Sequence, residues 1–329
     1  MVGGALGTIP SGDASGVRDH GREDGGAWAM KAEVSRVAYT HESVLPEAAV
    51  AYWGWAEDGV YVDATVGGGG HSLRLLQRFP SARLYAIDQD PAALAAARER
   101  LAAFSDRICW VEGNFRELDR WLGSEKVHGV LFDLGVSSAQ LDRPERGFSY
   151  QWDAPLDMRM NPNSPVTAFR LVNMRSKEEI AEALRTWGEE RWAGRIAEFV
   201  VKARAREPIR TTGQLVEVIK AAIPARARRE GGHPARRTFQ ALRIWVNDEL
   251  GALREGLSGA LAHLLPGGRI VAIAFHSLED RIVKQTFLAW QQEGQGSVLT
   301  RRPVLPGPEE VAQNPRARSA KLRAFQKSG

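Results

Sequence analysis

The sequence has 329 residues, of which 43% are hydrophobic and 26% are charged, and its formal net charge is +4. This composition is typical of a globular chain long enough for one large domain or two ordinary ones. No apolar run approaches the length that spans a bilayer, so a protein built from membrane-spanning helices is excluded. The one cysteine, Cys109, cannot form an internal disulfide, which favours a reducing, cytoplasmic location.

Residues 1–35 are rich in Gly, Ser and Asp and show no apolar periodicity, so we predict a disordered leader. No apolar core follows the first residues, which argues against a signal peptide. Basic residues gather further along the chain: residues 202–237 hold ten Lys and Arg against three Glu, and residues 299–329 hold seven against two. Such patches fit a polyanionic partner, with solvated helix faces as an equal alternative.

A run of four glycines, Gly67 to Gly70, follows a short β-favouring segment over residues 59–62. Residues 72–79 have helical spacing after it, and another helix is predicted earlier, over residues 46–53. Because glycine lacks a Cβ, the backbone of this turn can approach a ligand closely and adopt positive φ without strain. The helix that follows directs its free N–H groups at that ligand. The segment therefore predicts a strand, a glycine turn and a helix that together cradle a ligand.

Acidic residues follow the next predicted strand, residues 83–87. Asp88 and Asp90 lie about 20 residues past the glycines, where nucleotide-binding βαβ units place a carboxylate that accepts hydrogen bonds from ribose hydroxyls. The glycine spacing departs from the pyrophosphate-binding pattern G-x-G-x-x-G. It therefore suits an adenosine-bearing ligand without a pyrophosphate, such as S-adenosylmethionine. An ordinary βαβ turn with a helix-capping aspartate is the alternative.

The alternation of strands and helices continues through a helix over residues 91–101 and strands over residues 107–111 and 127–132. We therefore predict parallel strands, with the ligand beyond their carboxyl ends. Phe115 at that edge can meet an adenine ring, or it can be an ordinary core residue. Asp133 follows the strand over residues 127–132 and reaches the same edge.

Residues 141–235 interrupt this alternation. Three helices are predicted after a loop-like stretch: residues 176–187, 190–206 and 212–222. Basic and aromatic side chains interleave there, a combination that suits RNA backbone contacts and base stacking, while aromatic packing within the segment is the alternative. We predict a mainly helical insertion for RNA recognition between the two parts of a sheet domain, residues 36–140 and 236–329.

After the insertion, a long helix is predicted over residues 233–265, with a stop at Pro266-Gly267-Gly268. A fifth strand, residues 269–275, brings His276 to the ligand edge, and residues 278–290 form a helix. Two further segments are predicted to close the sheet as an antiparallel pair, joined by a loop: residues 298–302 and 320–325. The sequence contains no Cys/His cluster that suggests a zinc site, so no metal is predicted.

Several long motifs, all in one order, make the chain resemble a known family. They are the glycine run with His71 and Ser72, residues 133–138, 146–149, 155–160, 188–191, 237–244, 275–281 and 314–319. From Tyr39 to about Phe325 the chain is similar to the RsmH (MraW) family of bacterial S-adenosylmethionine-dependent methyltransferases. These enzymes modify the exocyclic amine of a cytidine in 16S ribosomal RNA. Residues 1–35 have no counterpart in the family, and Gly68 stands where members often carry Arg or Lys.

The resemblance implies a Rossmann-like class I methyltransferase sheet with helices on both faces and a helical insertion after the fourth strand. It implies S-adenosylmethionine as the cofactor, with contacts at Gly69, Gly70, His71, Asp88, Phe115, Asp133 and Gln140. The implied partner is 16S rRNA in the decoding region of the small ribosomal subunit, with no membrane partner. A homodimer stays open as an alternative to a monomer.

The implied reaction is demanding, because the lone pair of a cytosine amine is delocalised into the ring. Catalysis must come from alignment with the methyl group and from hydrogen-bond acceptors that favour a tetrahedral nitrogen. Asp133 is the candidate acceptor, and Ser137 and Ser138 are candidate polar contacts. His276 is a candidate proton acceptor, with a structural role as the alternative.

Candidate RNA contacts are Phe148, which could stack on the target base, and Arg191 and Arg237. A DNA amino-methyltransferase is the first rival function, but many such enzymes carry an Asp/Asn-Pro-Pro-aromatic turn that this chain lacks at Asp133. A non-catalytic RNA-binding assembly factor is the second rival, and the glycine turn, Asp88 and Asp133 argue against it. The glycine spacing disfavours a nicotinamide dehydrogenase.

Overall fold

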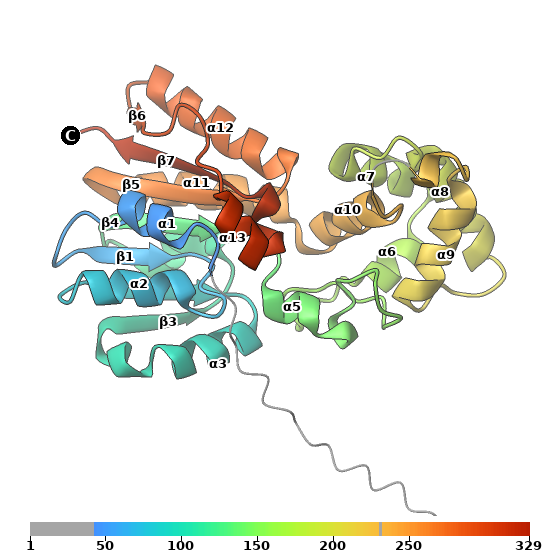
Figure 1. The fold of residues 1–329 in the computed structure, drawn as a ribbon, viewed down its shortest axis with the longest axis horizontal. Coiled ribbons are helices and arrows are strands. Elements are labelled where there is room, and N and C mark those ends of the chain that lie inside the picture. The colour runs from blue at the N-terminus through green and yellow to red at the C-terminus, as the bar shows by residue number, and fades with distance from the viewer. Residues whose placement is uncertain (1–42, 230–231) are drawn as a thin grey trace, which may run out of the picture. The chain divides into compact units, whose positions relative to one another are not determined.

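A computed structural model describes residues 43–229 and 232–329, so the predicted leader, residues 1–35, lies outside the described residues. Its centre is a seven-stranded sheet in the order β3-β2-β1-β4-β5-β7-β6 (Figure 1). The strands are β1 (Val60–Asp63), β2 (Arg83–Asp88), β3 (Ile108–Glu112), β4 (Val127–Asp133), β5 (Leu264–Ala274), β6 (Gly296–Val298) and β7 (Lys321–Lys327).

Strands β1 to β5 are parallel, as the sequence predicts, and β7 runs antiparallel to both β5 and β6. All four residues of β1 are buried, which explains why this central strand reads as an apolar run without alternation. The strand order reverses between β1 and β4, because β2 and β3 extend the sheet on one side and β5 on the other. Ligands of such sheets bind at this reversal, beyond the carboxyl ends of the strands.

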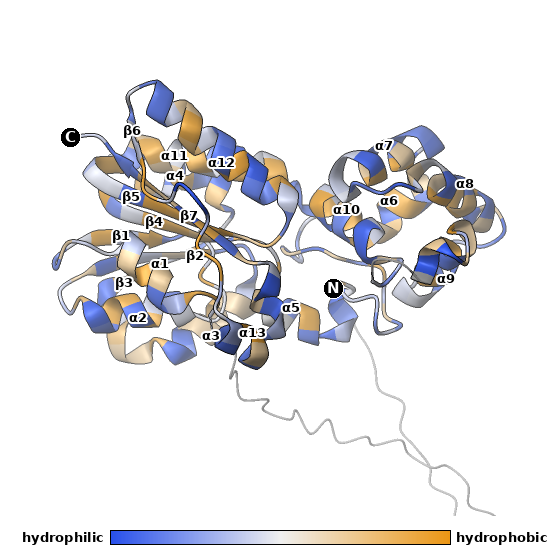
Figure 2. Ribbon diagram, turned by 45° about the horizontal axis from the view of Figure 1, so that its top comes forward, coloured by the Kyte–Doolittle hydropathy of each residue, from blue (hydrophilic) through white to orange (hydrophobic). Residues whose placement is uncertain are grey.

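Helices cover both faces of the sheet (Figure 1). One face packs against α1 (Pro46–Trp53), α2 (Gly70–Arg78) and α3 (Pro91–Arg100), and the other against α4 (Leu118–Leu122), α11 (Glu249–His263) and α12 (Ser277–Gln292). Figure 2 shows apolar residues concentrated on the strands, while the helices also carry polar ones. This arrangement confirms the predicted α/β fold. In the described part of the chain, no helix is long and apolar enough to cross a membrane.

Between β4 and β5 the chain forms a second apolar core from helices. The helices are α5 (Ser138–Asp142), α6 (Ala168–Met174), α7 (Lys177–Gly188), α8 (Ala193–Arg204), α9 (Thr212–Ala222) and α10 (Arg236–Asn247). Capping boxes at Ser176 and Thr211 start α7 and α9, close to the predicted positions. Phe239 and Leu242 of α10 belong to this core, so it extends past residue 235.

The long helix predicted over residues 233–265 is wrong, because it is two helices, α10 and α11, separated by Asp248. Asp248 has a φ of +47°, and its N–H caps α10 by donating to the carbonyl of Ile244. Its carboxylate accepts a 2.6 Å hydrogen bond from Arg116. Aspartate is among the few residues that tolerate this left-handed conformation, so the break has a local cause that helical periodicity does not reveal.

The carboxyl-terminal part differs from the prediction in detail. Leu264 already pairs with Val127 and Arg269 with Gly129, so Pro266-Gly267-Gly268 bulges out of β5 rather than ending a helix. Strand β6 covers only Gly296–Val298, and the predicted loop before β7 contains α13 (Pro308–Gln313). Glu310 of α13 accepts a 2.6 Å hydrogen bond from the backbone N–H of Leu45, so this segment is held against the residue that precedes α1.

Burial of α11 against the sheet predicts the effect of a single truncation. Leu257 is fully buried between α11 and the sheet. Leu257→Ala should lower the free energy of unfolding by about 2–5 kcal/mol, because a buried cavity remains. Leu288→Ala is the matched control, since Leu288 of α12 is 38% exposed, and its loss should stay below about 1 kcal/mol. Urea denaturation of both variants measures the difference, and equal losses would contradict the packing of α11.

Candidate active site

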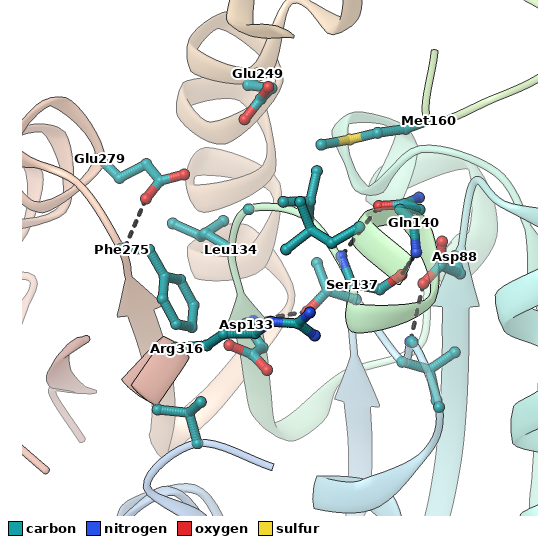
Figure 3. A pocket seen from close by; sticks show the side chains of 18 of the residues that line it. Asp88, Asp133, Leu134, Ser137, Gln140, Met160, Glu249, Phe275, Glu279 and Arg316 are labelled. Carbon is teal, nitrogen blue, oxygen red and sulfur yellow. Dashed lines mark hydrogen bonds between the residues drawn. The ribbon is translucent and has the colours of Figure 1, made fainter. Parts of the chain in front are cut away.

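A cavity of about 630 Å³ lies at the carboxyl edge of the parallel strands. The residues that follow β1, β2, β3, β4 and β5 all contribute to its wall, as the topology predicts. Figure 3 shows Asp88, Gln140 and Met160 on one side of the cavity, and Phe275 and Glu279 on the other. The cavity therefore extends from the end of β2 to the ends of β4 and β5.

The glycine run forms the turn between β1 and α2. Gly67 and Gly69 have φ of +52° and +76°, and a Cβ on Gly69 would lie 3.1 Å from a methyl of Leu101. Both observations explain why this turn needs glycine. Gly70 and His71 line the cavity, whereas Gly69 caps α2 and is not among the described lining residues.

Asp88 ends β2 and faces the cavity. Its carboxylate accepts 2.9 Å hydrogen bonds from the N–H groups of Gly67 and Asp90. The side chain is half-buried, and the loss of surrounding solvent raises the pKa of Asp88 to about 6. An aspartate held in this way can accept hydrogen bonds from a ligand, and it gains affinity for hydroxyl donors when it is ionised.

Asp63 is a second buried carboxylate that the sequence analysis did not select. It ends β1, is 1% exposed, and accepts a 2.6 Å hydrogen bond from the hydroxyl of Ser72. Burial raises the pKa of Asp63 to about 6. An aspartate at the end of an apolar strand, four residues before the glycine run, is the signal that could have revealed it.

Asp133 ends β4, and its side chain lies next to that of His71 in the cavity lining. The His71 Nε2 atom lies 3.4 Å from the Asp133 Oδ2 atom, and the His71 side chain is 5% exposed. Within the described residues, neither ring nitrogen of His71 nor the Asp133 Oδ1 atom has a hydrogen-bond partner. Buried polar atoms are nearly always paired in folded proteins, so these atoms are candidates for contact with a polar ligand.

Ser137 and Gln140 form a capping box at the start of α5. The Gln140 side chain accepts from the backbone N–H of Ser137 and donates to the Asp90 carboxylate at 2.9 Å. Both residues line the cavity, and the Ser137 hydroxyl already accepts from the Gln140 N–H at 3.2 Å. Ser138 opens α5, but its side chain lies outside the described part of the structure.

His276 caps α12 and is not among the described residues that line the cavity. Its Nε2 atom lies 3.1 Å from Oε1 of Glu279, which does line it. Burial favours a raised pKa for Glu279, but the charges of His276 and Arg243 outweigh it and lower that pKa. This placement favours the structural alternative for His276.

Arg243, Glu249 and Glu279 were missed by the sequence analysis, although all three line the cavity. The Nε and Nη2 atoms of Arg243 each donate to the Glu249 carboxylate at 2.8 Å. Glu249, His276 and Glu279 also lie close enough to share a metal ion. The guanidinium already supplies the positive charge that balances these carboxylates, which disfavours a cation there.

Phe115 combines the two roles that the sequence left open. Its ring packs edge-to-face on Phe132, with centroids 5.4 Å apart, and a Cβ on Gly256 would meet it at 2.6 Å. It also lines the cavity. Phe115 is therefore a partly buried core residue that keeps a surface toward the ligand space.

The three candidate RNA residues lie apart from the cavity, whose described lining includes none of them. Phe148 is 7% exposed and packs in the insertion core, so its ring is not available for stacking in this conformation. Arg191 is exposed and lies over the Trp192 ring, and Arg237 donates to the carbonyl of Glu189. Besides Arg243, four arginines of the described chain line the cavity and were missed: Arg100, Arg236, Arg316 and Arg318.

Comparison with known proteins supports the resemblance. The family described as the MraW methylase family matches residues 38–328. The ribosomal RNA small subunit methyltransferase H of Symbiobacterium thermophilum is 55% identical over 88% of this chain and 98% of the relative. Its namesakes from Heliobacterium modesticaldum and Geobacter sulfurreducens are 54% and 52% identical, over 82% and 88% of this chain and 93% and 100% of the relatives.

The raised pKa of Asp63 predicts a pH-dependent effect of neutralising it. Between pH 3.8 and about 6 the folded protein keeps a proton on Asp63 that the unfolded chain has lost, so this group's contribution to stability falls as pH rises through that window. Asp63→Asn carries no charge at any pH. As pH rises from 4 to 7, the free energy of unfolding of this variant should increase by about 1–3 kcal/mol relative to that of wild type. Urea denaturation across this range measures it, and parallel pH curves would contradict the assignment.

Proposed function

The chain belongs to the MraW methylase family, and we propose that it transfers a methyl group from S-adenosylmethionine to the exocyclic amine of a cytidine in 16S ribosomal RNA. We further propose that this cytidine lies in the decoding region of the small ribosomal subunit and that the reaction takes place in the cytoplasm. The continuous cavity from Asp88 to Phe275 carries the proposal. The end of the cavity at Asp88 suits the nucleoside of the methyl donor, and the end toward Asp133 and Phe275 suits the methyl group and the amine that receives it.

The residues present fit S-adenosylmethionine. Asp88 supplies an acceptor for ribose hydroxyls next to the Gly67 turn. Unpaired, buried nitrogen and oxygen atoms of His71 and Asp133 supply polar contacts further along, as counted among the described residues. When it is bound, S-adenosylmethionine provides a methyl group on positively charged sulfur, and the carboxylates at this edge favour a positive charge.

Asp133 is the residue best placed to act on the amine. Its carboxylate faces the cavity, with its backbone N–H fixed by a 2.7 Å hydrogen bond to the hydroxyl of Thr65. As an acceptor it can hold an amine N–H so that the nitrogen lone pair points away from the carboxylate and toward the methyl group. His71, 3.4 Å from Asp133, can orient the carboxylate and stabilise its charge.

Arginines in the cavity lining suit an RNA substrate. Arg236 comes from the start of α10, and Arg316 and Arg318 come from the segment between α13 and β7. Phosphate contacts of this kind position RNA without reading its sequence and weaken as salt rises. A base inside folded RNA must be splayed out of its stack to reach Asp133.

The test uses S-adenosylmethionine labelled on its methyl group and small ribosomal subunits from cells that lack the modification. Digested nucleosides are analysed by mass spectrometry, and the label is expected on the exocyclic amine of a cytidine. Transfer to duplex DNA instead would favour a DNA amino-methyltransferase. Absence of both transfer and cofactor binding would favour a non-catalytic assembly factor.

Two substitutions distinguish a catalytic role of Asp133 from a structural role of His276. Asp133→Ala should lower the single-turnover rate of methyl transfer by at least about 100-fold, because the amine loses its acceptor. His276→Asn keeps a side chain that can cap α12, and we expect its rate to stay within a few-fold of wild type. Rapid-quench kinetics measures both rates. A full rate for Asp133→Ala would remove this residue from the mechanism.

The raised pKa of Asp88 predicts that cofactor binding depends on pH. The ionised carboxylate accepts from ribose hydroxyls, and protonation below about pH 6 removes that acceptor. The dissociation constant of S-adenosylhomocysteine should therefore rise as pH falls below 6, by up to about tenfold per pH unit. Isothermal titration calorimetry measures it. Asp88→Asn should bind more weakly at pH 7.5 and lose most of this dependence, and an unchanged dependence would assign the effect to another group.

A further inference from the structure

Met160 brings a side chain from the segment after β4 into the nucleoside end of the cavity. It lines the cavity and is 7% exposed. Its Sδ atom lies 3.2 Å from Nε2 of Gln89, which donates to it. Gln89 directly follows Asp88, the candidate ribose acceptor. Met160 therefore lies beside the residues that follow β2, although it is distant from them in the sequence.

The ends of β2 and β3 complete this corner of the cavity. Asn114, which follows β3, donates from Nδ2 to Oε1 of Gln89 at 2.9 Å. Gly113, Asn114 and Phe115 line the cavity next to Gln89. Figure 3 shows Met160 on the same side of the cavity as Asp88, away from Phe275 and Glu279. These residues lie beside Asp88, so a flat ring attached to a ribose at Asp88 would meet them.

The backbone of Met160 is held from two sides. Its N–H donates to Oδ1 of Asn247 at 2.8 Å, and its carbonyl accepts from Arg146 at 2.9 Å. Asn247 also donates to the carbonyl of Met158 at 2.8 Å, and Met158 has a φ of +64°. Such a conformation is strained for a methionine and persists only where the surroundings fix it. The segment is thus built to hold Met160 in place.

The same network reaches the ribose acceptor. Arg146 donates from Nη1 to Oδ2 of Asp90 at 2.8 Å, and both side chains are largely buried. The backbone N–H of Asp90 in turn donates to the Asp88 carboxylate at 2.9 Å. The position of Met160 and the position of the Asp88 carboxylate are therefore fixed by one connected set of hydrogen bonds.

We propose that Met160 packs against the purine ring of the methyl donor, so that the segment after β4 supplies one wall of the nucleoside site. This inference rests on the proposed function, because it requires an adenosine-bearing ligand in the cavity. A thioether side chain is polarisable and makes favourable contacts with aromatic rings. Met160 comes from outside the sheet, so it would add to the cavity a wall that the strand ends do not supply.

Calorimetric binding of two ligands tests the proposal. S-adenosylhomocysteine and 5′-methylthioadenosine share the purine, the ribose and the thioether, and only the first carries the amino-acid group. Met160→Ala should weaken the binding of both by the same factor, roughly tenfold. Met160→Leu should restore most of the affinity, because it keeps the apolar volume.

Met174→Ala is the matched control, since Met174 lies on α6 and is 66% exposed, and both dissociation constants should stay at the wild-type value. Thermal unfolding of each variant checks that it is folded. If Met160→Ala does not fold, the affinities of Met160→Leu and of the polar variant Met160→Gln are compared instead. The proposal predicts weaker binding by Met160→Gln than by Met160→Leu. Wild-type affinity in both variants would overturn it.

The outcomes separate this inference from the function on which it rests. Binding by wild type together with unchanged binding by a folded Met160→Ala would overturn the contact and leave the proposed function intact. Weaker binding of S-adenosylhomocysteine alone would place Met160 at the amino-acid end, which also contradicts the proposal. If wild type bound neither ligand, the proposed cofactor itself would be wrong.

Discussion

Carboxylates that end neighbouring parallel strands, one buried and two half-buried against the cavity, are the constraint on which this structure depends. Asp63, Asp88 and Asp133 end β1, β2 and β4, and the topology brings all three to one edge. Burial of a carboxylate is unfavourable, and it raises the pKa of Asp63 and Asp88 to about 6. The N–H group of Gly67 and the Ser72 hydroxyl offset part of that penalty. A ligand that carries hydroxyl donors and a positive charge would offset more of it.

Arginine–carboxylate pairs connect the helical segment after β4 to this edge. Arg146 bonds to Asp90 after β2, Arg243 to Glu249 at the start of α11, and Arg281 of α12 to Glu189. Each pair joins residues on different elements, and the first two lie at or beside the cavity. These ion pairs therefore fix the helical segment to the rest of the fold, and Arg243 and Glu249 among them also line the cavity. A substitution in this segment can change ligand binding without touching the glycine turn.

The predictable features are those with a local cause in the sequence. The parallel strands, the glycine turn, the position of Asp88 at the end of β2 and the approximate starts of α7 and α9 follow from periodicity and turn chemistry. The break at Asp248 was missed because helical periodicity runs through it, and only the left-handed φ and the Arg116 contact reveal it. Met160, Arg243 and Glu249 were missed as site residues because distant contacts, not local pattern, bring them to the cavity. Phe148 fits base stacking by residue type, yet its position in the insertion core buries it.

The most direct test of this account is a crystal structure of the protein with S-adenosylhomocysteine and cytidine bound. We expect the ribose hydroxyls on the Asp88 carboxylate, the purine between the end of β3 and Met160, and the sulfur on the side toward Asp133. The cytosine amine should then point at the sulfur from the Asp133 end of the cavity. A nucleoside bound with its ribose away from Asp88, or a cytidine outside this cavity, would contradict the central claim that one space holds both reactants.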